Sequence, residues 1–209
     1  MIGTVSADQR AIIRGIRELH MAGLPFELDA TYGHGVFWKG TDAPRWRADL
    51  NPLPGVNVLA DCRELPFPSR SLSSVMFDPP FNHAHGAASP IGQRYGSYRT
   101  QAELQGLYGD AIAEFGRVLR PGGVLAAKCM DCVESGRQHA NHVHVYNEAI
   151  RRRFECLDLF VLTRSRVMVG WNHRGRQRHA RKHHCFFWVF RKLPMPSPPP
   201  TEPAHWRGR

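Results

Sequence analysis

The chain alternates short apolar runs, of the kind that form buried strands, with segments whose apolar side chains repeat at helical spacing. The helix-like segments are 6–23, 101–119 and 144–154, and the strand-like runs are 25–28, 46–49, 56–62, 74–81, 124–131, 154–162 and 184–192. Strands that alternate with helices predict a parallel sheet with helices on both faces. We therefore expect an α/β fold with a doubly wound, mostly parallel, seven-stranded sheet.

Both ends of the chain refine this expectation. No helix-like segment separates the runs at 154–162 and 184–192, so these two strands are expected to pair antiparallel at the edge of the sheet. At the other end, Ser6 is the expected N-cap of the first helix and Gln9 completes a capping box. Gly23 is expected to end that helix.

The length and composition indicate one globular domain. The 209 residues suffice for one sizeable core, and 42% of them are hydrophobic and 22% charged. No apolar run approaches the roughly 20 residues of a membrane helix, and no secretory signal is visible. We expect a single domain over 1–193 and a flexible proline-rich tail over 194–209. Five cysteines without regular spacing favour a reduced, cytoplasmic setting.

Positive charge is concentrated toward the C-terminal end. The chain holds 28 lysines and arginines against 18 acidic residues, a net charge of +10, and no acidic residue lies between Asp158 and Glu202. A basic segment at 163–184, with Trp171 and histidines among its cations, is typical of a nucleic-acid contact. The residues expected to bind phosphates are Arg174, Arg176, Arg178 and Arg181. A solubilising surface is the alternative for the same segment.

Three successive strand-like runs end in an aspartate, at Asp29, Asp49 and Asp61. In open α/β sheets, ligands bind beyond the carboxyl ends of the strands. Asp49 follows Asp29 by about 20 residues, the spacing at which an acid holds a ribose hydroxyl in nucleotide-binding sheets. Asp61 is placed for an adenine amino group, with Cys62 beside the ring. Together these residues predict a pocket for an adenosine-containing cofactor.

The loop after the first of these aspartates is expected to continue the pocket. Ala30 and Thr31 follow the acid directly. Gly33 and Gly35 permit close approach of the backbone to a ligand, although a plain turn is the alternative. The loop lacks the full dinucleotide fingerprint, and only ten residues separate Gly35 from Trp46, which leaves room for a very short helix. A cofactor without phosphate is therefore favoured.

The apolar run at 75–77 ends in Asp78-Pro79-Pro80-Phe81. Pro80 has no N–H, so strand pairing cannot continue through it, and its ring stiffens the loop that carries the acid. An acid, a rigid backbone and an aromatic ring at the end of a strand indicate a site that grips a ligand. An ordinary turn at the end of a strand is the alternative.

These motifs resemble a known enzyme family. The stretches LDATYGHG, ADCRELPFPSRSLSSVMFDPPF and LRPGGVLAAK look like those of class I S-adenosylmethionine-dependent methyltransferases, over residues 24–192. Asp78 to Phe81 is similar to the catalytic motif of DNA methyltransferases that modify adenine N6 or cytosine N4. The chain also looks like small stand-alone methylases of actinobacteria and their phages. Asp29 to Gly35 departs from the Phe-x-Gly-x-Gly cofactor motif of the family.

The resemblance implies S-adenosylmethionine as cofactor and a catalytic role for Asp78, Pro79, Pro80 and Phe81. The Asp78 carboxylate and the Pro79 carbonyl would accept hydrogen bonds from the two N–H groups of the target amine. Phe81 would stack on a base flipped out of the duplex. The implied function is methyl transfer to an exocyclic amine of DNA, adenine N6 before cytosine N4. An RNA or tRNA methyltransferase acting on an amino group and a non-catalytic nucleic-acid-binding protein of the same fold are the alternatives.

Two further features involve residues near position 130. The spacing Cys-x2-Cys-x6-His-x2-His, which could supply zinc ligands, is formed by Cys129, Cys132, His139 and His142. Because Cys129 lies in an expected buried strand and the spacing differs from that of common zinc fingers, no metal is expected. Lys128 ends the same strand and either faces the pocket or caps the sheet.

Overall fold

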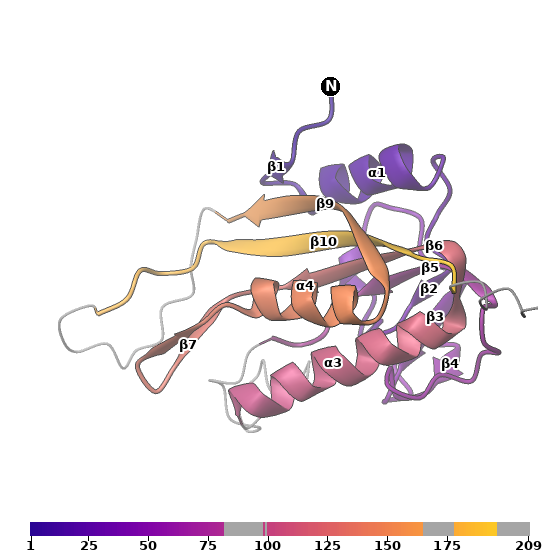
Figure 1. Cartoon of the computed structure of the whole chain (residues 1–209). Coiled ribbons are helices and arrows are strands. Elements are labelled where there is room, and N and C mark those ends of the chain that lie inside the picture. The colour runs from indigo at the N-terminus through magenta and orange to yellow at the C-terminus, as the bar shows by residue number, and fades with distance from the viewer. Residues whose placement is uncertain (82–97, 99, 165–177, 196–209) are drawn as a thin grey trace, which may run out of the picture.

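The computed structural model describes residues 1–81, 98, 100–164 and 178–195. Within these residues the main sheet has the strand order β1-β9-β10-β6-β5-β2-β3-β4 (Figure 1). Its strands are β1 (Val5–Ser6), β2 (Leu28–Asp29), β3 (Trp46–Asp49), β4 (Val58–Leu59), β5 (Leu72–Phe77), β6 (Leu119–Cys129), β9 (Phe154–Thr163) and β10 (His184–Lys192). A separate hairpin consists of β7 (Cys132–Glu134) and β8 (Arg137–His139). The helices are α1 (Gln9–His20), α3 (Gln101–Val118), α4 (Asn141–Arg151) and a short 3-10 helix, η1 (Val36–Trp38).

Neighbouring strands of the main sheet run parallel except at β10, which is antiparallel to both β9 and β6. The predicted doubly wound, mostly parallel α/β fold is confirmed, as is the antiparallel pairing of the last two strands. Two details of the prediction were wrong. The antiparallel strand β10 lies inside the sheet instead of at its edge, because β9 is the next strand outward and carries β1 on its far side. The sheet of the described residues also has eight strands, since the two-residue β1 is too short to show an alternating pattern.

Helices cover both faces of the sheet. Figure 1 shows α3 and α4 on one face and α1 on the other. Successive side chains of β5 point to opposite faces, so Val75 and Phe77 pack in the core beneath α3, whereas Met76 packs with Ile13 of α1. The run from Ser74 to Phe77 is buried, and Asp78, directly after the strand, is the first partly exposed residue beyond it. None of the helices in the described part of the chain is long and apolar enough to span a membrane.

The start of α1 differs from the prediction, whereas its end agrees. Asp8, and not Ser6, is the N-cap, because its carboxylate accepts the N–H of Arg10 at 3.0 Å. Ser6 belongs to β1, and its hydroxyl accepts the N–H of Asp8 at 3.0 Å. Gln9 is therefore the first helical residue and closes no capping box. At the other end, Gly23 has a φ of 78° and donates its N–H to a carbonyl in the last turn of α1 at 2.9 Å.

The connection between β2 and β3 contains only η1, which confirms that no full helix fits there. Trp38 of η1 is 4% exposed and packs against Phe26 and Phe37, with ring centroids 6.0 and 4.9 Å apart. This buried ring holds the connection close to the sheet. The loop at 29–35 therefore lies against the strand ends.

The Arg-Pro-Gly-Gly turn lies within β6 and brings it close to β5. Gly122 has a φ of 81°, a left-handed conformation that glycine adopts without strain. Gly123 meets a different requirement. A Cβ added there would lie 2.9 Å from the carbonyl oxygen of Arg120 and 3.1 Å from that of Ser73, which precedes the centre of β5. The second glycine therefore lets the two backbones approach each other.

Gly123→Ala is expected to destabilise the protein by about 1–3 kcal/mol, because backbone oxygens cannot move away from the added methyl group without shifting a strand. Gly106→Ala is the control. In the part of the chain that the structure describes, no atom beyond its own helical turn lies within 4 Å of a Cβ at that position, and alanine favours helix α3 by up to about 1 kcal/mol. Chemical denaturation measures both effects. Equal stability of Gly123→Ala and the wild type would contradict the explanation by close approach.

Candidate functional site

A cleft of about 1090 Å³ opens at the carboxyl ends of the parallel strands. It brings together ten of the twelve residues that the sequence predicts for catalysis and cofactor binding: Ala30, Thr31, Gly33, Asp49, Asp61, Cys62, Asp78, Pro79, Pro80 and Phe81. The other two, Asp29 and Gly35, do not line it. Residues from four separate stretches of the chain thus meet in one place, because the strands that carry them end at one edge of the sheet.

Asp29 is buried at 1% exposure and is fully engaged within the protein. Its Oδ1 accepts the N–H of Thr31 at 2.8 Å, and its Oδ2 accepts the indole N–H of Trp38 at 2.5 Å. Burial raises the pKa of Asp29 to about 7, although both hydrogen bonds favour the charged form. Asp29 therefore acts on the cleft indirectly, by tying the loop and η1 to the end of β2.

Gly35 also acts indirectly, through Tyr32. Gly35 has a φ of 68°, and a Cβ there would lie 2.5 Å from the hydroxyl oxygen of Tyr32. Gly55, with a φ of 88°, lies on the same tyrosine, with its added Cβ 3.0 Å from a ring carbon. Tyr32 lines the cleft and was not predicted as a site residue. The two glycines make room for its ring in the cleft wall.

Asp49 lines the cleft at the end of β3 and orders the loops around it. Its Oδ2 accepts the N–H of Gly33 at 2.9 Å, and its Oδ1 accepts the N–H of Asn51 at 2.9 Å. A carboxylate oxygen can accept more than one hydrogen bond. Asp49 therefore retains the capacity to accept hydrogen bonds from the hydroxyl groups of a ligand.

Asp61 and Cys62 line the cleft just beyond β4 with different surroundings. The Arg63 guanidinium contacts Asp61 with Nε at 3.0 Å and Nη2 at 2.6 Å, and these hydrogen bonds lower the pKa of Asp61. Burial raises the pKa of the Cys62 thiol to about 12, so this side chain is neutral near pH 7. A ligand amino group that binds Asp61 would donate to a carboxylate that already accepts hydrogen bonds from Arg63. Cys62 forms an uncharged part of the cleft wall next to Asp61.

Asp78 is held by direct contacts from two other segments. Its N–H donates to the Thr31 hydroxyl at 3.0 Å, which joins it to the loop after β2. Its Oδ2 accepts the Lys128 ammonium at 3.1 Å, and this ammonium also donates to Gln9 Oε1 at 3.1 Å. Gln9 was not predicted as a site residue, and the side chain of Lys128 faces the pocket, the first of its two alternatives. A lysine inside the buried run of β6 is the sequence signal for such a role, since buried lysines need partners.

Aromatic rings surround the same ammonium group. Lys128 Nζ lies 5.1, 5.4 and 5.8 Å from the ring centroids of Phe37, Phe187 and Phe81. Pro79 is buried, whereas Pro80 and Phe81 are half-buried. The ring of Phe81 thus forms part of the cleft wall next to the charged pair.

The basic segment starts beside the cleft. Arg164, the first residue after β9, lines the cleft and donates its N–H to a carbonyl just before β10 at 2.7 Å. Of the four predicted phosphate-binding residues, Arg174 and Arg176 lie outside the described residues. Arg178 and Arg181 are described and exposed, and they do not line the cleft. The segment therefore leaves the sheet, and returns to it, on the cleft side.

The residues with zinc-like spacing are engaged separately. Cys129 is fully buried in β6, and the Cys132 thiol donates to Gln101 Oε1 at 2.9 Å. His142 Nδ1 lies 2.8 Å from Asp131 Oδ1. In the ranges that the structure describes, no three side chains among His, Cys, Asp and Glu are grouped to hold a metal ion. All five cysteines are free thiols.

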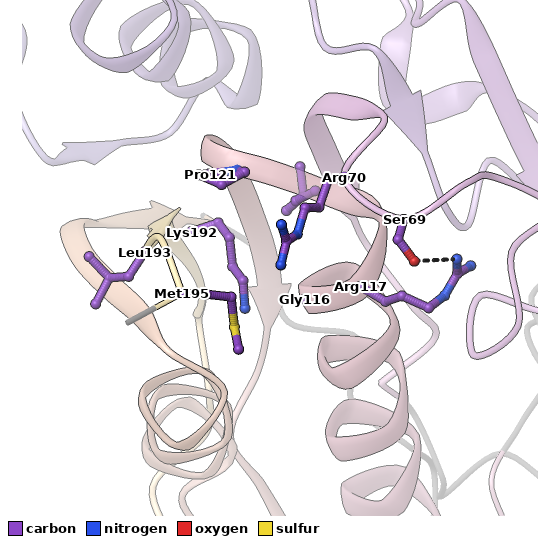
Figure 2. A pocket seen from close by; sticks show the side chains of 9 residues that line it. Ser69, Arg70, Gly116, Arg117, Pro121, Lys192, Leu193 and Met195 are labelled. Atoms are coloured by element: carbon purple, nitrogen blue, oxygen red, sulfur yellow. Dashed lines mark hydrogen bonds between the residues drawn. The ribbon is translucent and has the colours of Figure 1, made fainter. Parts of the chain in front are cut away.

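A second, smaller cavity of about 220 Å³ lies at the opposite end of the strands (Figure 2). Its lining includes Arg70, which precedes β5, and Lys192, which ends the antiparallel strand β10. Figure 2 shows Lys192 beside Met195, with Arg117 directed toward Ser69. No residue predicted for catalysis or binding lines this cavity. Of these two sites, only the larger cleft is therefore lined by predicted site residues.

Asp29→Asn tests the burial of this carboxyl group. Between pH 3.8 and about 7 the folded chain keeps a proton that the unfolded chain has lost, so the free energy of unfolding falls as the pH rises. The fall is complete above pH 7 and is at most about 4 kcal/mol. Because the variant lacks this contribution, the stability of the wild type relative to Asp29→Asn should decrease by up to that amount between about pH 4 and pH 8. Parallel pH dependences in denaturation experiments would contradict the raised pKa.

Comparisons with known proteins bear on the fold. At the level of sequence, no protein-family model and no curated protein matches the chain. The 1,6-didemethyltoxoflavin-N1-methyltransferase of Burkholderia thailandensis, solved with S-adenosylhomocysteine, is 18% identical, with a TM-score of 0.54 over 90% of this chain and 80% of that chain. TrmN from Thermus thermophilus is 18% identical, with a TM-score of 0.52 over 88% of this chain and 48% of that chain.

A candidate DNA modification methylase from Thermus thermophilus, complexed with S-adenosyl-L-methionine, is 20% identical, with a TM-score of 0.45 over 67% of this chain. The chain spans about half the length of that protein, 53–56% in its matched structures. The first two similarities extend over most of this chain. The fold of this chain is that of class I S-adenosylmethionine-dependent methyltransferases.

Proposed function

We propose that the protein transfers a methyl group from S-adenosylmethionine to an exocyclic amino group of a DNA base, with adenine N6 preferred over cytosine N4. The observation that carries this proposal is that Asp78 to Phe81 share one cleft with the strand-end residues suited to an adenosine. The preference for adenine comes from the resemblance of the Asp-Pro-Pro-Phe motif to that of amino-methylating enzymes.

The residues of the cleft fit the proposed cofactor. Asp49 would accept the ribose hydroxyls, and Cys62 would lie beside the adenine ring. Gly33 has a φ of 57°, and among the described residues beyond its chain neighbours no atom lies within 4 Å of a Cβ placed there, so its backbone is open to a ligand. At about 1090 Å³ the cleft reaches the upper end of the range for small-molecule sites, which leaves room for a base beside the cofactor.

Asp78 and Pro79 would activate the target amine. The lone pair of an exocyclic amine is delocalised into the base, which makes the nitrogen a weak nucleophile. Hydrogen bonds from its two N–H groups to the Asp78 carboxylate and the Pro79 carbonyl would favour a tetrahedral nitrogen with a free lone pair. S-adenosylmethionine supplies the electrophilic methyl group. Asp78 is also placed to take the proton that the methylated nitrogen loses.

The charge distribution supports a nucleic-acid substrate. Arg164 lies on the cleft wall, and Arg178 and Arg181 are exposed on the segment that returns to β10. Cations beside the cleft would hold phosphates and orient the nucleic-acid strand without reading its sequence. A cytoplasmic location is proposed with this substrate, since all five thiols are unpaired. Arg174 and Arg176 remain proposed phosphate contacts on the strength of the sequence.

Two substitutions separate catalysis from cofactor binding. Asp78→Ala is expected to lower kcat by about 100-fold or more, because the amine loses its charged acceptor, while the Kd for S-adenosylhomocysteine stays within about twofold. Asp49→Ala is the matched variant and should raise that Kd about tenfold or more, through loss of a hydrogen bond to a charged group. Calorimetry and a methyl-transfer assay measure both. Full turnover by Asp78→Ala would end the proposed mechanism.

The substrate is tested with DNA and RNA of the same sequence. Incubation with S-adenosylmethionine followed by mass spectrometry of the nucleosides should show N6-methyladenine in DNA. The Asp78→Ala protein serves as the blank. N4-methylcytosine would change the assigned base, and methylated amines in RNA alone would assign the enzyme to RNA. Cofactor binding without any methylated base in either polymer would overturn the proposal in favour of a non-catalytic protein.

A further inference from the structure

We infer that Lys128 is a positioning residue for the proposed reaction, which holds the Asp78 carboxylate so that one of its oxygens is left for the target amine. The inference rests on the proposed function, because that function gives Asp78 its role. Lys128 Nζ donates to Asp78 Oδ2 at 3.1 Å. Among the described residues, no hydrogen bond from the protein reaches Asp78 Oδ1.

Burial distinguishes this ion pair from an ordinary surface salt bridge. The side chain of Lys128 is 5% exposed and that of Asp78 is 20% exposed. A buried ammonium is costly unless acceptors surround it. Here Asp78, Gln9 and three aromatic rings fill its surroundings. Two of the three N–H groups of the ammonium are thus engaged by Asp78 and Gln9, and Lys128 would act through Asp78.

Gln9 fixes the position of the ammonium. Its Nε2 donates to the Phe37 carbonyl at 3.1 Å, so its Oε1 is turned toward Lys128. Gln9 is the first residue of α1, and Phe37 belongs to η1, so two elements outside the strand ends determine where the charge lies. The Thr31 hydroxyl accepts the N–H of Asp78 and thereby holds the backbone of that residue.

This arrangement would affect turnover more than binding. The carboxylate can rotate about its Cβ–Cγ bond, and only some orientations direct an oxygen to the amine. The contact with Lys128 occupies Oδ2 and restricts that rotation. Loss of the contact should lower the fraction of bound complexes in a reactive geometry, with little effect on the affinity for either substrate.

Lys128→Met tests the inference, because methionine has nearly the same shape and cannot donate a hydrogen bond. We expect kcat to fall about tenfold or more, while KM for the nucleic acid and Kd for S-adenosylhomocysteine stay within about twofold. Lys192→Met is the matched control. Lys192 is a half-buried lysine that donates to the Arg152 carbonyl at 2.9 Å and lines the second cavity (Figure 2). Its substitution should leave kcat unchanged.

A kcat for Lys128→Met within twofold of the wild type would overturn the inference. If this variant does not fold, as judged by thermal unfolding, Gln9→Leu takes its place. Leucine keeps most of the volume of Gln9 and removes the acceptor that anchors the ammonium. A loss of kcat of about threefold or more is expected, and an unchanged kcat would count against the inference.

A double-mutant cycle tests whether Lys128 acts through Asp78. In the Asp78→Asn background, adding Lys128→Met should cost little further activity, since the charged partner is already absent. An additive loss would show that Lys128 acts by another route.

The contact itself has a readout that needs no turnover. The ¹⁵N ammonium signal of Lys128 should be visible in NMR spectra, because the group is buried and hydrogen-bonded, and should shift in Asp78→Asn. An unchanged signal would overturn the inference even if the protein proves inactive on nucleic acids. Absence of activity with a shifted signal would refute the proposed function alone.

Discussion

The parallel pairing of β6, β5, β2 and β3 is the constraint on which the rest of the structure depends. Because parallel strands end at one edge, the residues at their ends form a row across the sheet: Lys128, Asp78, Asp29 and Asp49. The antiparallel strand β10 borders this row and adds Phe187 beside the lysine. This row is polar, whereas β2 and most of β5 behind it are buried.

Each charge in this row has a partner that determines what it can do. Asp29 is enclosed by donors from Thr31 and Trp38 and holds the loop in place. Asp49 accepts backbone N–H groups while facing the cleft. Asp78 shares one oxygen with Lys128 and faces the cleft beside Phe81. The degree of burial therefore separates structural acids from those that are available to a ligand.

The sequence predicts the strand ends well, because an acid or a proline that interrupts an apolar run can be recognised from the sequence alone. It does not distinguish Asp29 from Asp49, since both follow a strand and only the packing of Trp38 over the first buries it. The sequence also does not predict the roles of Gln9 and Lys128, because these two residues are in contact but lie 119 positions apart in the chain. The interior position of β10 arises because β10, and not β9, pairs with β6, and the hydrophobic pattern does not predict which of the two strands does so.

A crystal structure of the protein with S-adenosylhomocysteine would test most directly whether the strand-end cleft is the reaction site. We expect the ribose hydroxyls on Asp49, the adenine beside Cys62, and the sulfur facing Asp78, with the contact to Lys128 intact. A ligand bound in the smaller cavity beside Lys192, or one whose sulfur lies remote from Asp78, would contradict the proposed site.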